Sequence, residues 1–194
     1  AAKVMGLSVA GVDILRSIAD RSLIRSNWMG YSKSGDALSD AAWRMVMKEM
    51  DSIWYWMWSG AGSYRGYLTP TLDFYDCTAD LTREMKPVRE GLGDLLMKLK
   101  PRHSRIAIYY SVPSAITGSF ENGTSFLKPK QAHDFTAQFI YDLGLDFRYL
   151  TPESLRKGEL NLDEFTVLLL PMTQALGADD VKAIRNFALN GGTV

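Results

Sequence analysis

The chain has 194 residues, of which 46% are hydrophobic, and its 22 basic and 22 acidic side chains give a formal net charge of zero, so it can bury a core but has no basic surface for nucleic acid. Its longest apolar runs, such as 165–172, are far shorter than the ~20 residues of a membrane helix, which argues against a membrane partner. Cys77 is the single cysteine, which excludes an internal disulfide framework, and with only His103 and His133 as further soft ligands we expect neither a metal site nor another cofactor.

Helices and strands alternate in the first half of the chain. The spacing of apolar residues predicts helix, strand, helix, strand and helix at 4–19, 21–31, 39–50, 53–58 and 82–98. Ser39 is predicted to cap the second of these helices, with Asp40 in its first turn. A basic, proline-broken link at 98–102 follows, and we place a domain boundary there, between residues 1–100 and 101–194.

The pattern after this boundary is typical of a parallel sheet. Strands are predicted at 105–112, 146–150 and 165–171, with helices at 129–143, 152–157 and before Gly191. The longest of these helices has its apolar side at Ala132, Phe135, Phe139, Ile140 and Leu143. Because strands that alternate with helices need crossover connections, we predict a doubly wound, flavodoxin-like sheet. It is expected to be cut short at Val194, where an unpaired edge would cause the isolated chain to self-associate.

The strand at 53–58 is crowded with aromatic residues. Core packing is one interpretation, for at least two of them, because aromatic side chains bury large areas and are enriched in strands. Alternation along a strand places Trp54, Trp56 and Trp58 on one face. A tryptophan at the carboxyl end of an enclosed barrel strand is well placed to stack on a sugar ring. Trp58 is the best candidate for substrate binding because it comes last.

The loop from 59 to about 78 is much longer than the ~4–6 residues of an ordinary connection. Long loops on rigid scaffolds often carry function, and the tyrosine, arginine and aspartate side chains here would suit the wall of a carbohydrate pocket. Tyr64 and Arg65 are weaker candidates for substrate binding at its rim. A polar surface loop is the alternative, and the sequence does not decide between the two.

Other reactive residues do not form a recognisable catalytic site. Cys77 lacks the glycine-flanked turn of an exposed nucleophile and is interpreted as inert. His133 has no cysteine or glutamate at the spacing of a triad, and we interpret it as a surface histidine. The turn 111–115 follows a strand where flavodoxin-like folds bind phosphates, but it lacks a glycine-rich cradle.

Taken together, the two halves resemble the family 42 β-galactosidases and their relatives among clan A glycoside hydrolases. The segments similar to the end of that family's (β/α)8 barrel are 39–44, 53–60, 66–68 and the helix to Lys100. Those similar to its β-galactosidase trimerisation domain, which has the fold of class I glutamine amidotransferases without their cysteine and histidine chemistry, are 104–111, 165–171 and 187–194.

The resemblance implies a retaining glycosidase with an acid/base glutamate on the fourth barrel strand and a nucleophilic glutamate on the seventh. It also implies a carbohydrate substrate, a β-galactoside or related β-glycoside, and a homo-oligomer, which is a trimer in that family. The fourth strand is expected to lie outside this chain. The seventh should fall near Leu23 to Tyr31, which contains neither Glu nor Asp, so no catalytic residue is assigned.

The sequence thus predicts the carboxyl-terminal part of a glycosidase (β/α)8 barrel over 1–100, followed by an incomplete flavodoxin-like domain over 101–194, and a chain that is inactive by itself. A second possibility is a non-catalytic carbohydrate-binding or assembly protein built on a degenerate glycosidase, which the missing carboxylate near Trp28 favours. A third, an amidotransferase-like or nucleotide-binding domain, would need a glycine-flanked cysteine or a phosphate loop.

Overall fold

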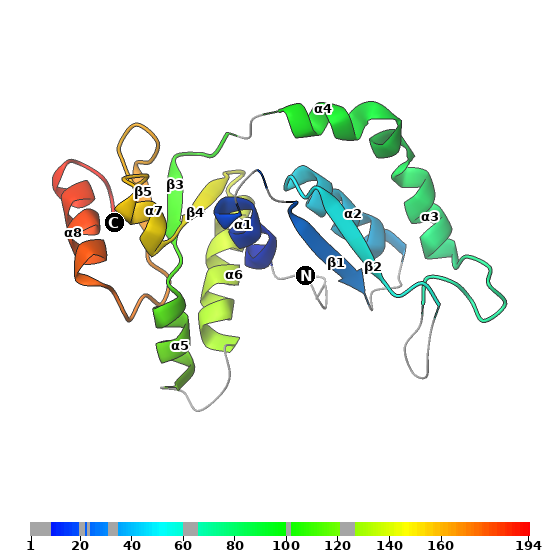
Figure 1. Ribbon diagram of the computed structural model, residues 1–194, viewed down its shortest axis with the longest axis horizontal. Helices are drawn as coiled ribbons and strands as arrows, with labels where there is room; N and C mark the ends of the chain where they lie inside the picture. The colour runs from blue at the N-terminus through cyan, green and yellow to red at the C-terminus, as the bar shows by residue number, and fades with distance from the viewer. Residues whose placement is uncertain are drawn as a thin grey trace. The chain divides into compact units, whose positions relative to one another are not determined.

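A computed structural model describes residues 9–19, 22, 24–30, 35–59, 66–99, 102–120 and 127–194 (Figure 1). The described residues form two compact units. Unit 1 comprises those between 19 and 100, and unit 2 combines helix α1 (Val9–Ile18) with those between 101 and 194. The units change between residues 99 and 102 of the described chain, and α1 lies with the second unit. The assignment of the segments to a barrel and a trimerisation domain stays a prediction.

Unit 1 contains a strand, helix, strand arrangement. Strands β1 (Ser26–Gly30) and β2 (Ser52–Trp56) pair in parallel, and α2 (Gly35–Met47) connects them. One face of α2 packs into the core through residues at helical spacing, namely Leu38, Ala41, Ala42 and Met45. This arrangement confirms the predicted order of strand, helix and strand, and it shows that the two strands are parallel.

The predicted cap of α2 is wrong. The helix begins at Gly35, four residues before Ser39, and has Asp36 in its first turn. Ser39 is buried inside the helix, and Asp40 accepts a hydrogen bond from Arg44 at 2.9 Å on its exposed surface. An acidic residue in the first turn stabilises a helix by interacting with the helix dipole. In α2 this residue is Asp36 and not the predicted Asp40.

A polar clamp joins the amino ends of β1 and β2. The backbone N–H of Arg25 donates to Asp51 Oδ2 at 2.7 Å, and its Nε donates to the same oxygen at 3.1 Å. The guanidinium also reaches Glu49 Oε2 at 3.3 Å. Partial burial acts to raise the pKa of Asp51, but the hydrogen bonds and charge of Arg25 outweigh it and hold that pKa below its ordinary value.

The single helix predicted over 82–98 is broken into three pieces. The structure has α3 (Asp76–Glu84), a π-helical turn at Val88–Leu92 and α4 (Gly93–Lys98). Gly91 has a φ of 126°, which ends helical geometry inside the turn. The apolar spacing spans the break, and it therefore does not show where the helix is interrupted.

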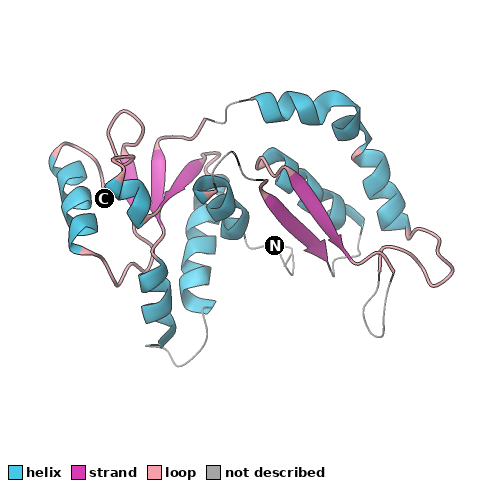
Figure 2. Cartoon of the chain, in the orientation of Figure 1, coloured by secondary structure: helices cyan, strands magenta, loops and turns pink. Residues whose placement is uncertain are grey.

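Unit 2 is built around a parallel sheet, as predicted, and its strands lie in the order β4-β3-β5. These strands are β3 (Ile106–Tyr109), β4 (Phe147–Leu150) and β5 (Val167–Leu169). Figure 2 distinguishes strands from helices by colour. The helices are α5 (Val112–Phe120), α6 (Leu127–Asp142), α7 (Pro152–Arg156) and α8 (Ala178–Leu189). Thr193 forms a parallel bridge to Val167, so the residues after α8 continue the sheet beside β5. Helix α5 was not predicted, because its Ser, Thr and Gly residues are weak helix formers.

The sheet of unit 2 has an apolar core on each face. Ala107 and Tyr109 of β3 point to the side of α7 and α8, where Leu155 and Phe187 are buried. Ile108 points to the opposite side with Phe147, Tyr149, Ala10 of α1, and Ala137 and Ile140 of α6. Successive strand residues point to opposite faces, which is why both sides of a parallel sheet need helices.

Two predictions for α6 are wrong. Its large apolar residues Phe135, Phe139 and Leu143 are exposed, whereas His133 is buried on the face shared with Ala137. The helix therefore packs with smaller residues inward, at His133, Ala137 and Ile140, which are four and three positions apart. None of the described helices is long and apolar enough to cross a membrane.

Candidate functional site

The strands of unit 1 end together at one edge of their sheet. Gly30 of β1 is opposite Trp56 of β2, and both are the last residues of their strands. The carboxyl ends of parallel strands are where α/β proteins bind ligands. Strand β2 stops at Trp56, so Trp58 lies two residues beyond the strand in which it was predicted.

Three tryptophans form an open aromatic face on this pair of strands. Trp28 is opposite Trp54 in the register, and Trp56 follows on the same face because side chains alternate. They retain 42%, 68% and 54% of their exposure respectively. In the described part of the chain these three side chains are exposed and do not belong to a buried core.

The opposite face is closed by Tyr67. Its ring packs edge to face on Tyr55, with centroids 5.5 Å apart, and its hydroxyl donates to the carbonyl oxygen of Met29 at 3.2 Å. Burial raises the pKa of Tyr67 to about 12, so the hydroxyl keeps its proton. Thr78 of α3 donates its hydroxyl to the Tyr67 carbonyl at 3.0 Å. The second half of the long loop is thus fixed to both strands and to α3.

Trp58 is held at the end of β2 by its backbone and by its ring. Its carbonyl oxygen accepts the N–H groups of Tyr67 and Leu68, each at 3.0 Å. The indole meets Phe74 edge to face, with centroids 5.9 Å apart and an angle of 84° between the rings. The Trp58 side chain is still 60% exposed, so the ring is positioned but not covered.

Tyr67 is one of the loop tyrosines that the sequence offered for the wall of a pocket, whereas no role was predicted for Phe74. The place of Phe74 beside Trp58 depends on the path of the loop. Tyr64 and Arg65, the predicted rim residues, lie outside the described residues. The site as described therefore brings together Trp58 and Phe74, beside the open face of Trp28, Trp54 and Trp56.

No carboxylate lies on the strands that form this site. Among the described residues, β1 reads Ser-Asn-Trp-Met-Gly and β2 reads Ser-Ile-Trp-Tyr-Trp. Asn27 uses its side-chain oxygen to accept the N–H of Trp28 at 2.8 Å. The site can stack on an apolar surface, but its described strands have no group that could act as a general acid, a base or a nucleophile.

The corresponding edge of unit 2 is occupied by its own backbone. The hydroxyls of Ser111 and Ser114 both donate to the carbonyl oxygen of Ala175, at 3.2 and 2.9 Å. Ser114 Oγ also accepts the Ala175 N–H at 2.9 Å. The turn where a phosphate would bind is thus tied to the segment after β5. Cys77 is buried, and no group of three or more metal-ligating side chains occurs in the described part of the chain.

Comparisons with known proteins connect this architecture to one kind of enzyme. No protein-family model and no curated protein matches the chain. The GH42 β-galactosidase Gan42B superposes with a TM-score of 0.68 over 95% of this chain and 29% of its own, at 12% identity. A catalytic mutant of Gan42B from G. stearothermophilus gives 0.64 over 82% and 23%, at 14% identity. A β-galactosidase from the haloarchaeon Halorubrum lacusprofundi gives 0.62 over 95% and 29%, at 11% identity.

The chain shares its fold with part of these β-galactosidases. It spans about a quarter of the length of the enzymes it matches, between 23% and 29%. Identities of this size show similarity of fold and not of activity. They support the predicted resemblance to family 42 at the level of a glycoside hydrolase-like piece with parallel sheets.

Proposed function

We propose that this chain is part of a glycoside hydrolase that cleaves β-galactosides or related β-glycosides with retention. In this proposal, residues 1–100 form the end of a (β/α)8 barrel and 101–194 a flavodoxin-like, trimerisation-type domain. The observation that carries the proposal is the fold match to Gan42B, which extends over 95% of the chain and includes both units. The exposed tryptophan at the carboxyl end of β2 is consistent with it.

Trp58 would act as the platform for a sugar ring. The apolar face of a pyranose packs well on an exposed indole, and the Phe74 contact reduces the entropy lost when the ring is immobilised. Tyr64 and Arg65 are proposed for hydrogen bonds at the rim of the same pocket. This division gives the chain a binding role and leaves bond cleavage to groups elsewhere.

The two catalytic carboxylates of this proposal lie outside β1 and β2. Retaining glycosidases need two carboxyl groups ~5–5.5 Å apart, and neither described strand contains one. Asp51 is occupied with Arg25 at the opposite ends of the strands. The chain alone is therefore expected to hydrolyse no glycoside.

A homo-oligomer, a trimer by resemblance, is proposed as the working state. Unit 2 exposes apolar residues four positions apart at two adjacent helices: Val112, Ile116 and Phe120 on α5, and Phe135 and Phe139 on α6 with Leu143 directly after it. Contiguous exposed apolar residues mark interaction surfaces. Phe139→Ser should lower the association constant seen by sedimentation; an unchanged constant would remove this surface from the proposal.

The test of the enzymatic role is substrate turnover by the complete protein that contains this chain. Trp58→Ala should lower kcat/KM for a β-galactoside about tenfold, the equivalent of ~1.4 kcal/mol of lost stacking. Leu72→Ala is the matched control, because Leu72 is 70% exposed on the same loop, and it should leave kcat/KM unchanged. Equal turnover in the two variants would contradict the stacking role.

A non-catalytic carbohydrate-binding or assembly protein is the second candidate. The observation that favours it is the sequence of β1, which has Asn27 and no acidic residue where the resemblance calls for a nucleophile. The two candidates differ in one measurement. If the complete protein binds galactose, as seen by calorimetry, but releases no product from any β-galactoside offered, the binding protein is the correct assignment.

A further inference from the structure

The residues after α8 complete one edge of the sheet in unit 2. The N–H of Thr193 donates to the carbonyl oxygen of Thr166 at 2.9 Å, and the carbonyl oxygen of Thr193 accepts the N–H of Leu168 at 2.8 Å. Thr193 thereby pairs in parallel with Val167 of β5. Because β5 is the last strand in the order β4-β3-β5, this segment covers the outer side of that strand.

Asn190 and Gly191 form the turn that leads from α8 to this segment. The backbone N–H and the side-chain Nδ2 of Asn190 both donate to the carbonyl oxygen of Asn186, at 3.0 and 2.9 Å. The N–H of Gly191 donates to the carbonyl oxygen of Ala188 at 3.1 Å, and its φ of 104° is one that a glycine adopts without strain. These hydrogen bonds fasten the turn to the end of α8, although the side chain of Asn190 is exposed.

Gly192 lies directly against the ring of Phe187. Its N–H donates to the carbonyl oxygen of Phe187 at 3.0 Å, and a Cβ added at Gly192 would overlap the buried ring. The change Gly192→Ala must therefore displace either the turn or the ring. It offers a way to loosen the turn without altering Asn190 or Gly191.

An asparagine that is followed by a glycine can lose its side-chain amide without an enzyme. The nitrogen of Gly191, once hydroxide has taken its proton, attacks Cγ of Asn190. The new N–Cγ bond forms as the Cγ–Nδ2 bond breaks, and Nδ2 takes a proton from water and leaves as ammonia. Water then opens the succinimide at one of its two carbonyl groups, which gives aspartate or isoaspartate. Glycine favours the attack because it has no side chain to hinder the nitrogen.

We propose that Asn190 is a deamidation site, that the hydrogen bonds of its turn set the rate, and that its conversion weakens the pairing of Thr193 with β5. In the folded chain the N–H of Gly191 is bonded to Ala188, so the turn has to open before the nitrogen can attack. Opening of a helix end needs far less free energy than unfolding of the whole unit.

Both products disfavour the closed turn. Isoaspartate adds one carbon to the path of the backbone, so the turn no longer matches the distance from α8 to β5. Aspartate loses the Nδ2 donor that binds Asn186, and it places a negative charge at the carboxyl end of α8, where the helix dipole is unfavourable. Conversion should therefore expose the outer side of β5.

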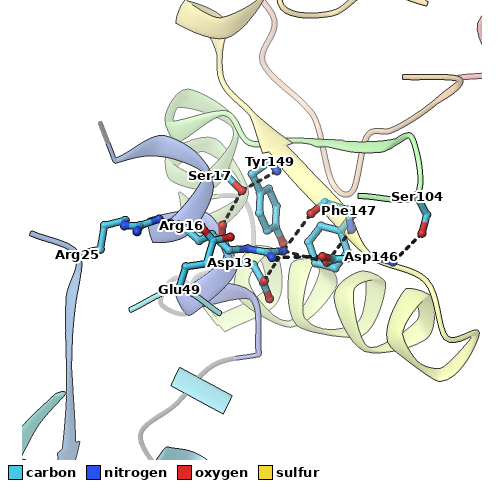
Figure 3. Close-up of polar contacts among 9 residues, drawn as sticks. All are labelled: Asp13, Arg16, Ser17, Arg25, Glu49, Ser104, Asp146, Phe147 and Tyr149. Carbon is cyan, nitrogen blue, oxygen red and sulfur yellow. Dashed lines mark hydrogen bonds and ion pairs between the residues drawn. The ribbon is translucent and has the colours of Figure 1, made fainter. Parts of the chain in front are cut away.

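The opposite edge of the sheet does not depend on this turn (Figure 3). Arg16 Nη2 of α1 donates to the carbonyl oxygen of Phe147 at 3.1 Å, and Ser17 Oγ accepts the N–H of Tyr149 at 3.0 Å. Side chains of α1 thus cover the outer backbone groups of β4. The exchange of the Leu168 amide proton reports on the edge at β5, and that of the Tyr149 amide proton reports on the edge at β4.

The experiment incubates the full chain in mildly alkaline buffer, with and without urea, and follows Asn190 by mass spectrometry of its peptides. Peptide mapping separates Asn190 from Asn122, the other asparagine that a glycine follows in the sequence. The folded chain should convert Asn190 about tenfold more slowly than the chain in urea, because the hydrogen bonds of the turn must open first. Equal rates in the two conditions, or no conversion in urea, would overturn the proposal.

Two variants distinguish opening of the turn from unfolding of the whole unit. Gly192→Ala should remove most of the difference between the folded chain and the chain in urea. Ile140→Ala weakens the apolar core on the other face of the sheet and leaves the turn in place, so it should not change the rate in the folded chain. An equal acceleration in the two variants would show that conversion needs unfolding of unit 2, which contradicts a rate set by the turn.

Asn190→Asp tests the effect on the sheet directly, and it also serves if Gly192→Ala does not fold. In this variant the Leu168 amide should exchange about tenfold faster than in the unaltered chain, whereas the Tyr149 amide should keep its rate. Faster exchange at both edges would indicate a general loss of stability. Unchanged exchange of the Leu168 amide would show that the turn does not hold Thr193, and either result would overturn the proposal.

Discussion

The imidazole of His133 packs against the ring of Tyr149 inside unit 2, with centroids 5.7 Å apart and planes inclined by 48°. Tyr110 meets the same imidazole at 5.3 Å. Neither His133 Nδ1 nor the Tyr149 hydroxyl has a hydrogen-bond partner among the described residues. A histidine predicted to lie on the surface is therefore part of an aromatic core.

This position makes the stability of unit 2 depend on pH. Burial lowers the pKa of His133 to about 4, against a smaller opposing effect of Asp134, whereas the unfolded chain has a value near 6.5. The stability that neutral, buried His133 contributes to unit 2 is fully present above pH 6.5. It is lost as the pH falls toward 4, because the histidine of the unfolded chain takes up a proton in this range and the buried one does not. We expect the free energy of unfolding to fall by ~3 kcal/mol over this interval.

Urea unfolding between pH 7 and pH 4 measures this effect. His133→Leu should remove most of the slope, because leucine does not titrate. His103→Gln is the control and should keep the slope. An equal slope in the His133→Leu variant would show that other groups cause the acid sensitivity.

The hydroxyl of Tyr149 should be dispensable. A buried hydroxyl without a partner costs free energy, so Tyr149→Phe is expected to raise the free energy of unfolding by ~1 kcal/mol. Tyr109→Phe is the matched change on the neighbouring strand. Its hydroxyl donates to Asp180 Oδ2 at 3.0 Å, and the variant should lose ~2 kcal/mol because the buried carboxylate loses its donor. Denaturant unfolding of both variants would be compared, and effects of the same sign would contradict this account.

The Arg25 clamp should control how firmly β1 and β2 hold together. Arg25→Met leaves Glu49 and Asp51 side by side without the cation, so the pair of strands should lose ~2 kcal/mol of stability. Arg44→Met removes an exposed ion pair within α2 and should cost under ~0.5 kcal/mol. Hydrogen exchange of the Asn27 to Met29 amides reports on this directly. Equal protection of these amides in the Arg25→Met and Arg44→Met variants would mean that the Arg25 clamp stabilises the strands no more than an exposed ion pair does.

The sequence predicted the parallel pairing in unit 2, because strands that alternate with helices need crossover connections. In unit 1 it predicted the order of strand, helix and strand. It did not predict which side of α6 is buried. His133, Ala137 and Ile140 have helical spacing, but Phe135, Phe139 and Leu143 have it too and are larger. Periodicity identifies faces and does not decide which one meets the sheet. That choice depends on the space available beside β4, where α1 also packs.

The candidate site was predicted in part. The sequence predicted an aromatic strand ending at Trp58, and the structure has that strand end two residues earlier. The contact of Trp58 with Phe74, sixteen residues later, depends on the path of the loop. The burial of Tyr67 depends on the same path. Secondary-structure propensity carries no information about such contacts. They depend on the hydrogen bonds that Tyr67 makes with Trp58, Thr78 and Met29, which lie far from one another in the sequence.

The membership of α1 in unit 2 has a consequence for the order of folding. The hydrogen bond between Ala10 and Asp134 joins residues 124 positions apart, with the whole of unit 1 between them in the chain. Closing so long a loop costs conformational entropy, and the groups that α1 binds exist only when β4 has paired with β3. We expect the Tyr149 amide to gain protection after that of Ile108 in pulsed hydrogen exchange. Helix α1, which precedes the rest of unit 2 in the described chain, would then be the last part of that unit to reach its place.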